Sequence, residues 1–291
     1  MTQIVQSLAD ISGRYRALFV DLWGCLHDGV RALPEAVEAL RRFKAGGGLV
    51  ILVTNSPRPR TGVVDQLERM GVPGDCWDTI ATSGDSARAA MFRGAVGRRV
   101  WVIGEFADFD FFAPIGVVDD PVAIERVSLE EAEGIVCLGP EDPLAEPSVY
   151  RPQFLMAKTR GLKLLCANPD IVVDRGEVRE WCAGALAALY TEMGGESLYF
   201  GKPHPPIYDL ARRRLAEIAD VERGDILCIG DGIGTDIAGA MGEGMDSLFI
   251  TGGLAAAETG TGAGRGPDPE LLSRFTAERG TSPTYAIGKL C

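Results

Sequence analysis

Short apolar runs alternate with amphipathic helical stretches along the whole chain. The first third contains the apolar runs ALFVDLW at 17–23, LVILVT at 49–54 and DTIATSG at 78–84, which we interpret as strands. Residues 34–47 begin with a proline, carry apolar side chains at helical spacing and end in glycines, so they predict a helix. A second helix is expected from about residue 60. Buried strands joined by helices are typical of a parallel sheet covered by helices, and thus of an α/β fold.

The same alternation continues in a middle series that has enough strands and helices to form a core of its own. Its strands are expected at 101–104, 134–139 and 162–168, and its helices at 148–160 and 183–193. The last third returns to the first pattern, with strand-like and helical segments expected at 198–203, 205–219, 225–231, 234–242 and 246–251, followed by a Gly-rich loop, a short helix and a strand-like 284–288. Two cores within one chain are therefore predicted.

Charge and composition exclude several kinds of partner. The chain of 291 residues has 41 acidic and 29 basic residues, a net charge of -12 and a mean hydropathy of +0.08. Nucleic acid and anionic membranes require clustered lysine and arginine, so we expect neither as a partner. The N-terminal residues resemble no signal peptide and no run is long enough to span a membrane, which predicts a cytoplasmic protein. Seven scattered cysteines predict reduced thiols, with Cys25 as a small buried side chain.

Polar side chains lie at or just past the carboxyl ends of four of the predicted strands. They are Asp21, Thr54 with Asn55, Lys202, and Asp231. The carboxyl ends of parallel strands share one sheet edge, where loops and helix N-termini gather and ligands bind. Each residue alone is more often a cap, a turn or a surface side chain. The coincidence of all four favours one shared pocket.

The residue types fit phosphate chemistry. A phosphate ester resists attack by an anion, so an attacking carboxylate needs a divalent cation and a positive side chain nearby. Asp21 would be the nucleophile and form an aspartyl phosphate. Mg²⁺ prefers oxygen ligands, which Asp21 and Asp231 offer, while Asp236 could orient its water shell. Thr54 and Lys202 would hold the phosphoryl group.

Four motifs carry a resemblance to a known family. DLWGCLHDG, LVTNSPRPR, YFGKPHPPIYDLA and IGDGIGTDIAGA resemble, in order and spacing, the motifs of the haloacid dehalogenase-like (HAD) superfamily. The GKPxPxIY signature looks like its class IIA branch, which includes NagD-type nucleotide phosphatases, 4-nitrophenyl phosphatases and pyridoxal phosphatases. The resemblance covers nearly the whole chain. It implies a doubly wound, Rossmann-like core of residues 1–84 and 197–291, with an α/β cap of the C2 type inserted at 85–196.

The resemblance also implies roles for individual residues. Asp21 would be the nucleophile, and Thr54 and Lys202 would bind phosphate. The Mg²⁺ ligands would be Asp21, Asp231, Asp236 and the main-chain carbonyl of Trp23. The segment ANPD at 167–170 resembles a cap element that faces the active site. Candidate substrate contacts are Asn55, Arg58, Asn168 and Asp170. The expected substrate is a small phosphorylated metabolite, and the expected state is a monomer or a homodimer.

Trp23 departs from the family pattern. Phosphatases of this family usually have a second aspartate there, which protonates the leaving oxygen and then activates water. General acid or base catalysis is worth typically about 10² to 10⁴ in rate. His27 or Asp28 could substitute as proton donor. We therefore expect a phosphatase that is slow because it lacks the usual general acid. The alternative is a catalytically impaired relative that binds a phosphorylated metabolite.

The glycine-rich turn IGDGIGTD offers a competing interpretation as a dinucleotide-binding oxidoreductase. Its glycines follow a predicted strand and open a helix. Their spacing, however, is G-x-G-x-G, one residue shorter than the dinucleotide fingerprint, and Asp231 would face the pyrophosphate. We therefore favour the hydrolase.

Overall fold

The chain divides into two compact units. The computed structural model describes residues 2–106, 109–113, 118, 120–175, 178–262, 264 and 266–291. The core unit consists of Met1–Thr54, Val64–Ala81 and Tyr208–Cys291, and the inserted unit consists of Asn55–Val63 and Thr82–Ile207. The insert predicted at 85–196 falls within the inserted unit, and its limits stay a prediction.

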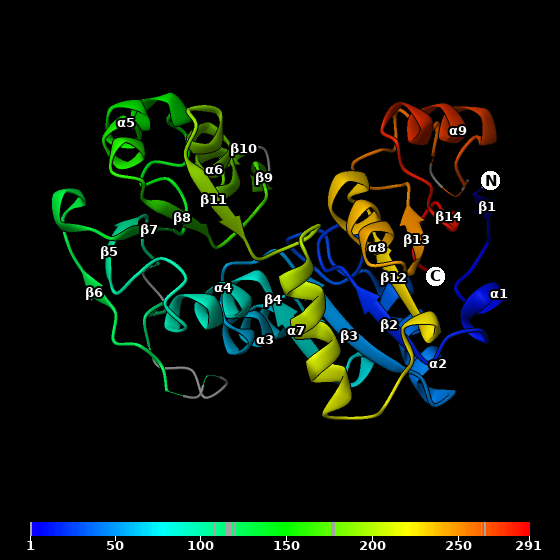
Figure 1. The fold of residues 1–291 in the computed structure, drawn as a ribbon. Helices are drawn as coiled ribbons and strands as arrows, with labels where there is room; N and C mark the ends of the chain where they lie inside the picture. The colour runs from blue at the N-terminus through cyan, green and yellow to red at the C-terminus, as the bar shows by residue number, and fades with distance from the viewer. Residues whose placement is uncertain are drawn as a thin grey trace. The chain divides into compact units, whose positions relative to one another are not determined.

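The core unit is built on a seven-stranded sheet (Figure 1). Its strands, in spatial order, are β1 (Gln3–Ile4), β14 (Tyr285–Ile287), β13 (Asp246–Ile250), β12 (Ile226–Gly230), β2 (Ala17–Val20), β3 (Leu49–Thr54) and β4 (Thr79–Thr82). The pairs from β1 to β3 are all parallel. Every residue of β2 and β12 is buried, which explains why these strands are continuous apolar runs rather than alternating ones.

Helices accompany these strands. They are α1 (Ala9–Ser12), α2 (Pro34–Ala45), α3 (Arg60–Arg69), α7 (Pro205–Ala216), a π-helical turn (Ile233–Ile237), α8 (Ala238–Gly242) and α9 (Pro269–Glu278), with 3₁₀ turns at Gly74–Cys76 and Arg223–Asp225. α2 starts at proline and buries Leu40 and Phe43, as predicted. The side chain of Asp268 caps α9, whose Phe275 stacks on Phe249 of β13 with ring centroids 6.0 Å apart.

The inserted unit has a parallel five-stranded sheet of its own. Its strands, in spatial order, are β11 (Glu196–Tyr199), β8 (Lys163–Cys166), β7 (Gly134–Cys137), β5 (Arg99–Ile103) and β6 (Glu125–Arg126). An antiparallel pair, β9 (Val172–Arg175) and β10 (Val178–Trp181), lies outside this sheet. The helices are α4 (Ser83–Phe92), α5 (Arg151–Thr159) and α6 (Ala183–Glu192), with 3₁₀ turns at Leu129–Glu131 and Pro147–Tyr150.

Alternate residues of β7 point to opposite faces of this sheet. Ile135 and Cys137 belong to a cluster with residues of α5 and α6. Val136 belongs to a second cluster, which includes Ala87 and Met91 of α4. The inserted unit therefore has hydrophobic packing on both faces of its sheet. The predicted fold class, a parallel-sheet α/β core with a second α/β domain, is confirmed.

Several elements were not predicted from the apolar pattern, among them α4 and the pair formed by β9 and β10. α4 is buried on nearly every side, so its sequence SGDSARAAMF contains no single apolar stripe that would mark it as a helix. The β9 and β10 pair follows the ANPD segment and mixes charged with apolar residues. In the described part of the chain, no helix combines the length and the apolar character needed to cross a membrane.

Candidate active site

Two aspartates leave the core sheet at one edge. Asp21 directly follows β2 and Asp231 directly follows β12, and these two strands are neighbours that run parallel. The Asp21 N–H donates to the Ile229 carbonyl at 2.8 Å, so the pairing continues to the first catalytic candidate. Asp231 is buried and Asp21 is half-buried. The sheet topology alone thus brings the two carboxylates together.

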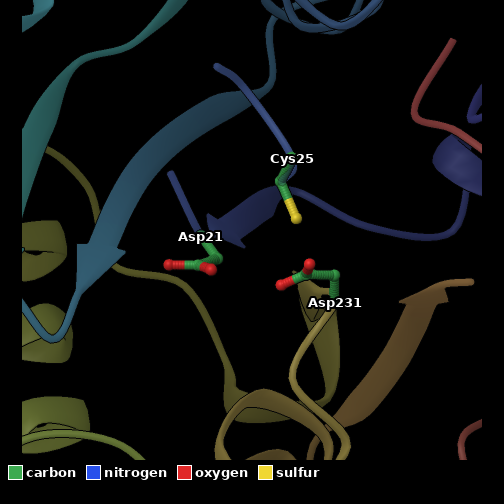
Figure 2. A group of neighbouring side chains, drawn as sticks. All are labelled: Asp21, Cys25 and Asp231. Carbon is green, nitrogen blue, oxygen red and sulfur yellow. The ribbon is translucent and has the colours of Figure 1, made fainter. Parts of the chain in front are cut away.

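A sulfur atom completes this group. One ligand atom from each of Asp21, Cys25 and Asp231 lies within 4.8 Å of the others (Figure 2). Among the described residues, this is the cluster of histidine, cysteine or acidic side chains with a spacing suited to a metal ion. Carboxylate oxygens are the ligands that Mg²⁺ prefers, so the donor set of the two aspartates fits that ion.

The position of the Asp231 carboxylate depends on two glycines. A Cβ atom at Gly24 would lie 2.3 Å from Asp231 Oδ2, and one at Gly253 would lie 2.2 Å from the same oxygen. The Leu254 N–H donates to this oxygen at 3.4 Å. The loop after β13 therefore holds the carboxylate that faces Asp21.

Asp236 lies on the π-helical turn and its side chain is engaged locally. Its Oδ2 accepts a hydrogen bond from the Gly232 N–H at 3.1 Å and one from Thr235 Oγ1 at 3.4 Å. Gly230 leaves room for it, since a Cβ there would lie 2.0 Å from the Asp236 Cγ. Asp236 is not part of the cluster whose ligand atoms lie within 4.8 Å of one another. Its role toward a metal stays a prediction.

Trp23 is half-buried and lies against the loop that follows β2. Its indole Nε1 would be 2.9 Å from a Cβ atom at Gly29, a residue whose φ of +89° also favours glycine. The indole provides one N–H donor and neither an acid nor a base. The use of the Trp23 carbonyl as a metal ligand stays a prediction.

Neither nearby candidate for the missing proton donor is suited to that role. Burial lowers the pKa of His27, and its Nδ1 accepts a hydrogen bond from the Gly29 N–H at 3.1 Å. Hydrogen bonds from the Arg31 and Val30 backbone lower the pKa of Asp28, whose Oδ1 accepts them at 2.9 and 3.0 Å. At neutral pH the histidine is therefore neutral and the aspartate ionised, and both are engaged in the loop itself.

Thr54 ends β3, where it is buried at the same edge of the core sheet as the two aspartates. The next residue, Asn55, belongs to the inserted unit, and its amide is fully used there. Its Nδ2 donates to Asp170 Oδ1 at 2.8 Å and to the Lys202 carbonyl at 3.2 Å, and its Oδ1 accepts from the Lys202 N–H at 2.7 Å. Asn55 therefore clamps the backbone of Lys202, a buried residue, rather than leaving amide hydrogens for a ligand.

The other predicted substrate contacts lie in the inserted unit. Asn168 Oδ1 accepts the N–H of Asp170 at 3.0 Å, a local turn. The Arg58 guanidinium lies 6.0 Å and 5.7 Å from the ring centroids of Phe106 and Phe109, within the range of cation–π attraction. Contact of these side chains with a substrate stays a prediction.

The predicted site residues thus form two groups. Asp21, Trp23, Thr54, Asp231 and Asp236 belong to the core unit, and Asn55, Arg58, Asn168, Asp170 and Lys202 belong to the inserted unit. The expectation that all four strand ends share one sheet edge is wrong for Lys202, because the preceding strand β11 belongs to the sheet of the inserted unit. That both groups share one pocket stays a prediction. The Gly253 loop and the position of the Cys25 sulfur beside the two aspartates were not foreseen. The glycines at 252 and 253, directly after the strand-like DSLFIT, were a signal for the Gly253 loop.

Comparison with known proteins places this arrangement in context. A family model described as haloacid dehalogenase-like hydrolase matches residues 18–117, and a second HAD-like hydrolase model matches residues 199–276. A solved haloacid dehalogenase-like hydrolase from Brucella suis 1330 is 38% identical, with a TM-score of 0.83 over 99% of this chain and 100% of that chain. The 5'-nucleotidase YutF of Bacillus subtilis (strain 168) is 26% identical over 84% of this chain and 90% of its own length. A Mycobacterium tuberculosis glycerol phosphate phosphatase, solved in complex with magnesium, shares the fold at 23% identity, with a TM-score of 0.63 over 86% of this chain and 71% of that chain.

Proposed function

The chain belongs to the haloacid dehalogenase-like hydrolases, as a phosphatase-type enzyme of the NagD-like branch, and we propose that it hydrolyses small phosphomonoesters with Mg²⁺ through an aspartyl phosphate. The observation that carries this proposal is the approach of the Asp21 and Asp231 ligand atoms to within 4.8 Å at the edge of a parallel sheet. The names of the relatives, a 5'-nucleotidase and a glycerol phosphate phosphatase, support phosphate esters as the substrate class.

Mg²⁺ fits the donor atoms of the core unit. Two carboxylates this close repel each other unless a proton or a cation lies nearby. Asp21, Asp231 and the Trp23 carbonyl would hold the ion, with Asp236 behind its water shell. When bound, Mg²⁺ would offset the negative charge of the phosphoryl oxygens. The magnesium complex of the Mycobacterium tuberculosis relative supports this choice of cation.

The reaction divides into two steps. A carboxylate oxygen of Asp21 attacks phosphorus, the bond from phosphorus to the ester oxygen breaks, and the leaving alkoxide takes up a proton from solvent water. Water then attacks the phosphorus of the aspartyl phosphate, the bond from phosphorus to the Asp21 oxygen breaks, and inorganic phosphate and a proton are released with the Asp21 carboxylate restored. The Thr54 hydroxyl and the Lys202 ammonium would bind the phosphoryl oxygens. Two facts support the proposal that Thr54 and Lys202 bind the same phosphoryl group. Asn55 follows Thr54 in sequence. Its Oδ1 accepts a hydrogen bond from the Lys202 N–H at 2.7 Å.

The Trp23 indole cannot protonate the leaving oxygen, because it is not an acid. His27 is buried with a lowered pKa and Asp28 is held ionised by backbone hydrogen bonds, since its pKa is also lowered. Leaving groups that depart without a proton should therefore react best. The same observation favours a second candidate function, in which the protein binds a phosphorylated metabolite and turns it over very slowly.

A leaving-group series with Mg²⁺ tests the proposal. Hydrolysis of 4-nitrophenyl phosphate at least about 10²-fold faster than of alkyl phosphates is the expected result, because nitrophenolate needs no proton donor. Equal rates would contradict the absence of an acid. Binding of phosphorylated metabolites with no hydrolysis of either ester would favour the binding function. Activity that survives exhaustive treatment with a chelator would overturn the Mg²⁺ requirement.

A further inference from the structure

Cys25 lies in a tight turn that folds back toward the two aspartates. The Leu22 carbonyl accepts the N–H of Leu26 at 2.8 Å and that of Cys25 at 3.4 Å, and Gly24 has a φ of +72°. Figure 2 shows the Cys25 sulfur directed toward the Asp231 carboxylate. The side chain is a reduced thiol that is 1% exposed. The chain therefore presents a soft ligand atom inside a site whose other donors are hard oxygens.

We propose that this centre binds thiophilic divalent cations, Zn²⁺ and Cd²⁺, through the sulfur of Cys25 together with one oxygen each from Asp21 and Asp231. Oxygen-only sites suit Mg²⁺, whereas a thiolate ligand selects softer ions, and zinc binds mixed ligands more tightly than the earlier divalent metals do. Ligand atoms around a tetrahedral zinc ion are roughly 3.5 Å apart, given metal–ligand distances of about 2.0 to 2.3 Å. Side chains whose ligand atoms already lie within 4.8 Å of one another need only a small adjustment.

Coordination has a defined proton balance. As the metal–sulfur bond forms, the thiol proton leaves to solvent, so three anionic ligand groups surround a doubly charged cation. The other cysteines do not offer this arrangement, because no other such cluster with acidic or histidine side chains occurs among the described residues. Burial also raises the pKa of Cys76 to about 11 and that of Cys137 to about 12, which keeps these two thiols protonated.

A consequence follows for catalysis, and it rests on the proposed function. A zinc or cadmium ion held by Cys25, Asp21 and Asp231 would use the same two carboxylates that Mg²⁺ needs, and would therefore exclude Mg²⁺. Zn²⁺ or Cd²⁺ should therefore inhibit the Mg²⁺-supported reaction, and a thiol-containing chelator should reverse the inhibition.

Cadmium provides a readout that does not depend on activity. Cd²⁺ is titrated into the metal-free protein while the ultraviolet sulfur-to-cadmium charge-transfer absorption and the heat of binding are recorded. The band should appear in the wild type and in the matched control Cys291→Ser, which removes a thiol distant in sequence. It should disappear in Cys25→Ser, with Cd²⁺ affinity at least about tenfold weaker. Asp231→Asn, which keeps the thiol, should also weaken Cd²⁺ binding.

The outcomes separate the two proposals. A band of equal size in Cys25→Ser, or cadmium binding to the wild type with no band, would overturn the role of Cys25. Circular dichroism of each variant confirms that loss of the band does not reflect unfolding; if Cys25→Ser fails to fold, Cys25→Ala and Asp231→Asn carry the test. Because no substrate is present, a chain without phosphatase activity could still show the band. An active phosphatase could equally lack it.

Discussion

The carboxylates of Asp21 and Asp231 face each other because β2 and β12 are adjacent parallel strands that end at one edge of the core sheet. The two residues are far apart in sequence, and the pairing of β2 with β12 brings them to the same sheet edge. Their ligand atoms lie within 4.8 Å of each other, at a spacing that a divalent cation can bridge. This relationship makes Asp21 the residue on which the proposed reaction depends.

Asp21→Asn should abolish turnover and leave the fold intact. The amide has the shape of the carboxylate but is a poor nucleophile, and loss of a covalent nucleophile lowers kcat by at least about a thousandfold. Turnover of 4-nitrophenyl phosphate and the thermal unfolding midpoint provide the two measurements. Asp65→Asn, a change at an exposed acid on α3, is the matched control and should keep wild-type activity. Full activity in Asp21→Asn would exclude this residue as nucleophile.

Gly253→Ala should weaken the response to Mg²⁺. The new Cβ would lie 2.2 Å from Asp231 Oδ2, so the carboxylate must move away from its present position. We expect the Mg²⁺ concentration for half-maximal activity to rise about tenfold, equivalent to about 1.4 kcal/mol. Gly242→Ala on α8 is the control, since a Cβ there meets nothing within 4 Å. An unchanged Mg²⁺ dependence would show that the glycine does not set the carboxylate position.

Trp23→Asp should raise the hydrolysis of alkyl phosphates relative to 4-nitrophenyl phosphate. The new carboxyl group would restore an acid where the indole now offers one N–H donor, and general acid catalysis is worth up to about 10² to 10⁴ in rate. The ratio of the two kcat/KM values is the quantity to measure. Trp23→Asn introduces a side chain of the same size as aspartate but without an acid, and so controls for loss of the indole ring. A folded Trp23→Asp variant with an unchanged ratio would contradict the account.

Asn55→Ala should destabilise the protein and weaken substrate binding. It removes the partner of the Lys202 N–H and of one Asp170 oxygen, and an unpaired buried polar group costs about 1 to 3 kcal/mol. We expect the free energy of unfolding in urea to fall by this amount. We also expect KM to rise, because the Lys202 backbone loses the hydrogen bond that positions it. Asn168→Ala, which removes one turn hydrogen bond, should have a smaller effect on both. Equal effects of the two substitutions would argue against a special role for the hydrogen bonds between Asn55 and the Lys202 backbone.

The sequence predicts most strands because they are buried on both faces. β2 and β3 appear in it as unbroken apolar runs, and the shared edge of parallel strands then predicts that Asp21 and Asp231 meet. α4 was not predicted because it buries polar residues, Ser83, Asp85, Ser86 and Arg88, together with its apolar ones, so its sequence has no apolar stripe.

Details that depend on loop conformation were beyond the sequence pattern. The position of Cys25 follows from the left-handed backbone of Gly24, and that of the Asp231 carboxylate follows from close contact with Gly253. Asn55 was predicted to contact substrate, but which partners satisfy an amide is decided by packing between segments distant in sequence. That Asn55 contacts the substrate therefore stays a prediction, and its observed hydrogen bonds indicate a positioning role.

Mild acid should destabilise the protein through its two histidines. Burial lowers the pKa of both His27 and His204, and His204 also stacks on Tyr199 with ring centroids 4.7 Å apart. In the unfolded chain both histidines would titrate at about pH 6.5. As the pH falls below this value, the unfolded state therefore binds more protons than the folded state. The stabilisation is therefore complete above about pH 6.5 and is lost progressively as the pH falls toward the lowered folded values. Free energies of unfolding in urea, measured between about pH 7.5 and about pH 5.5, should decrease with falling pH. His204→Phe, which keeps an aromatic ring but does not titrate, should reduce that slope, and a slope equal to that of the wild type would show that His204 does not contribute.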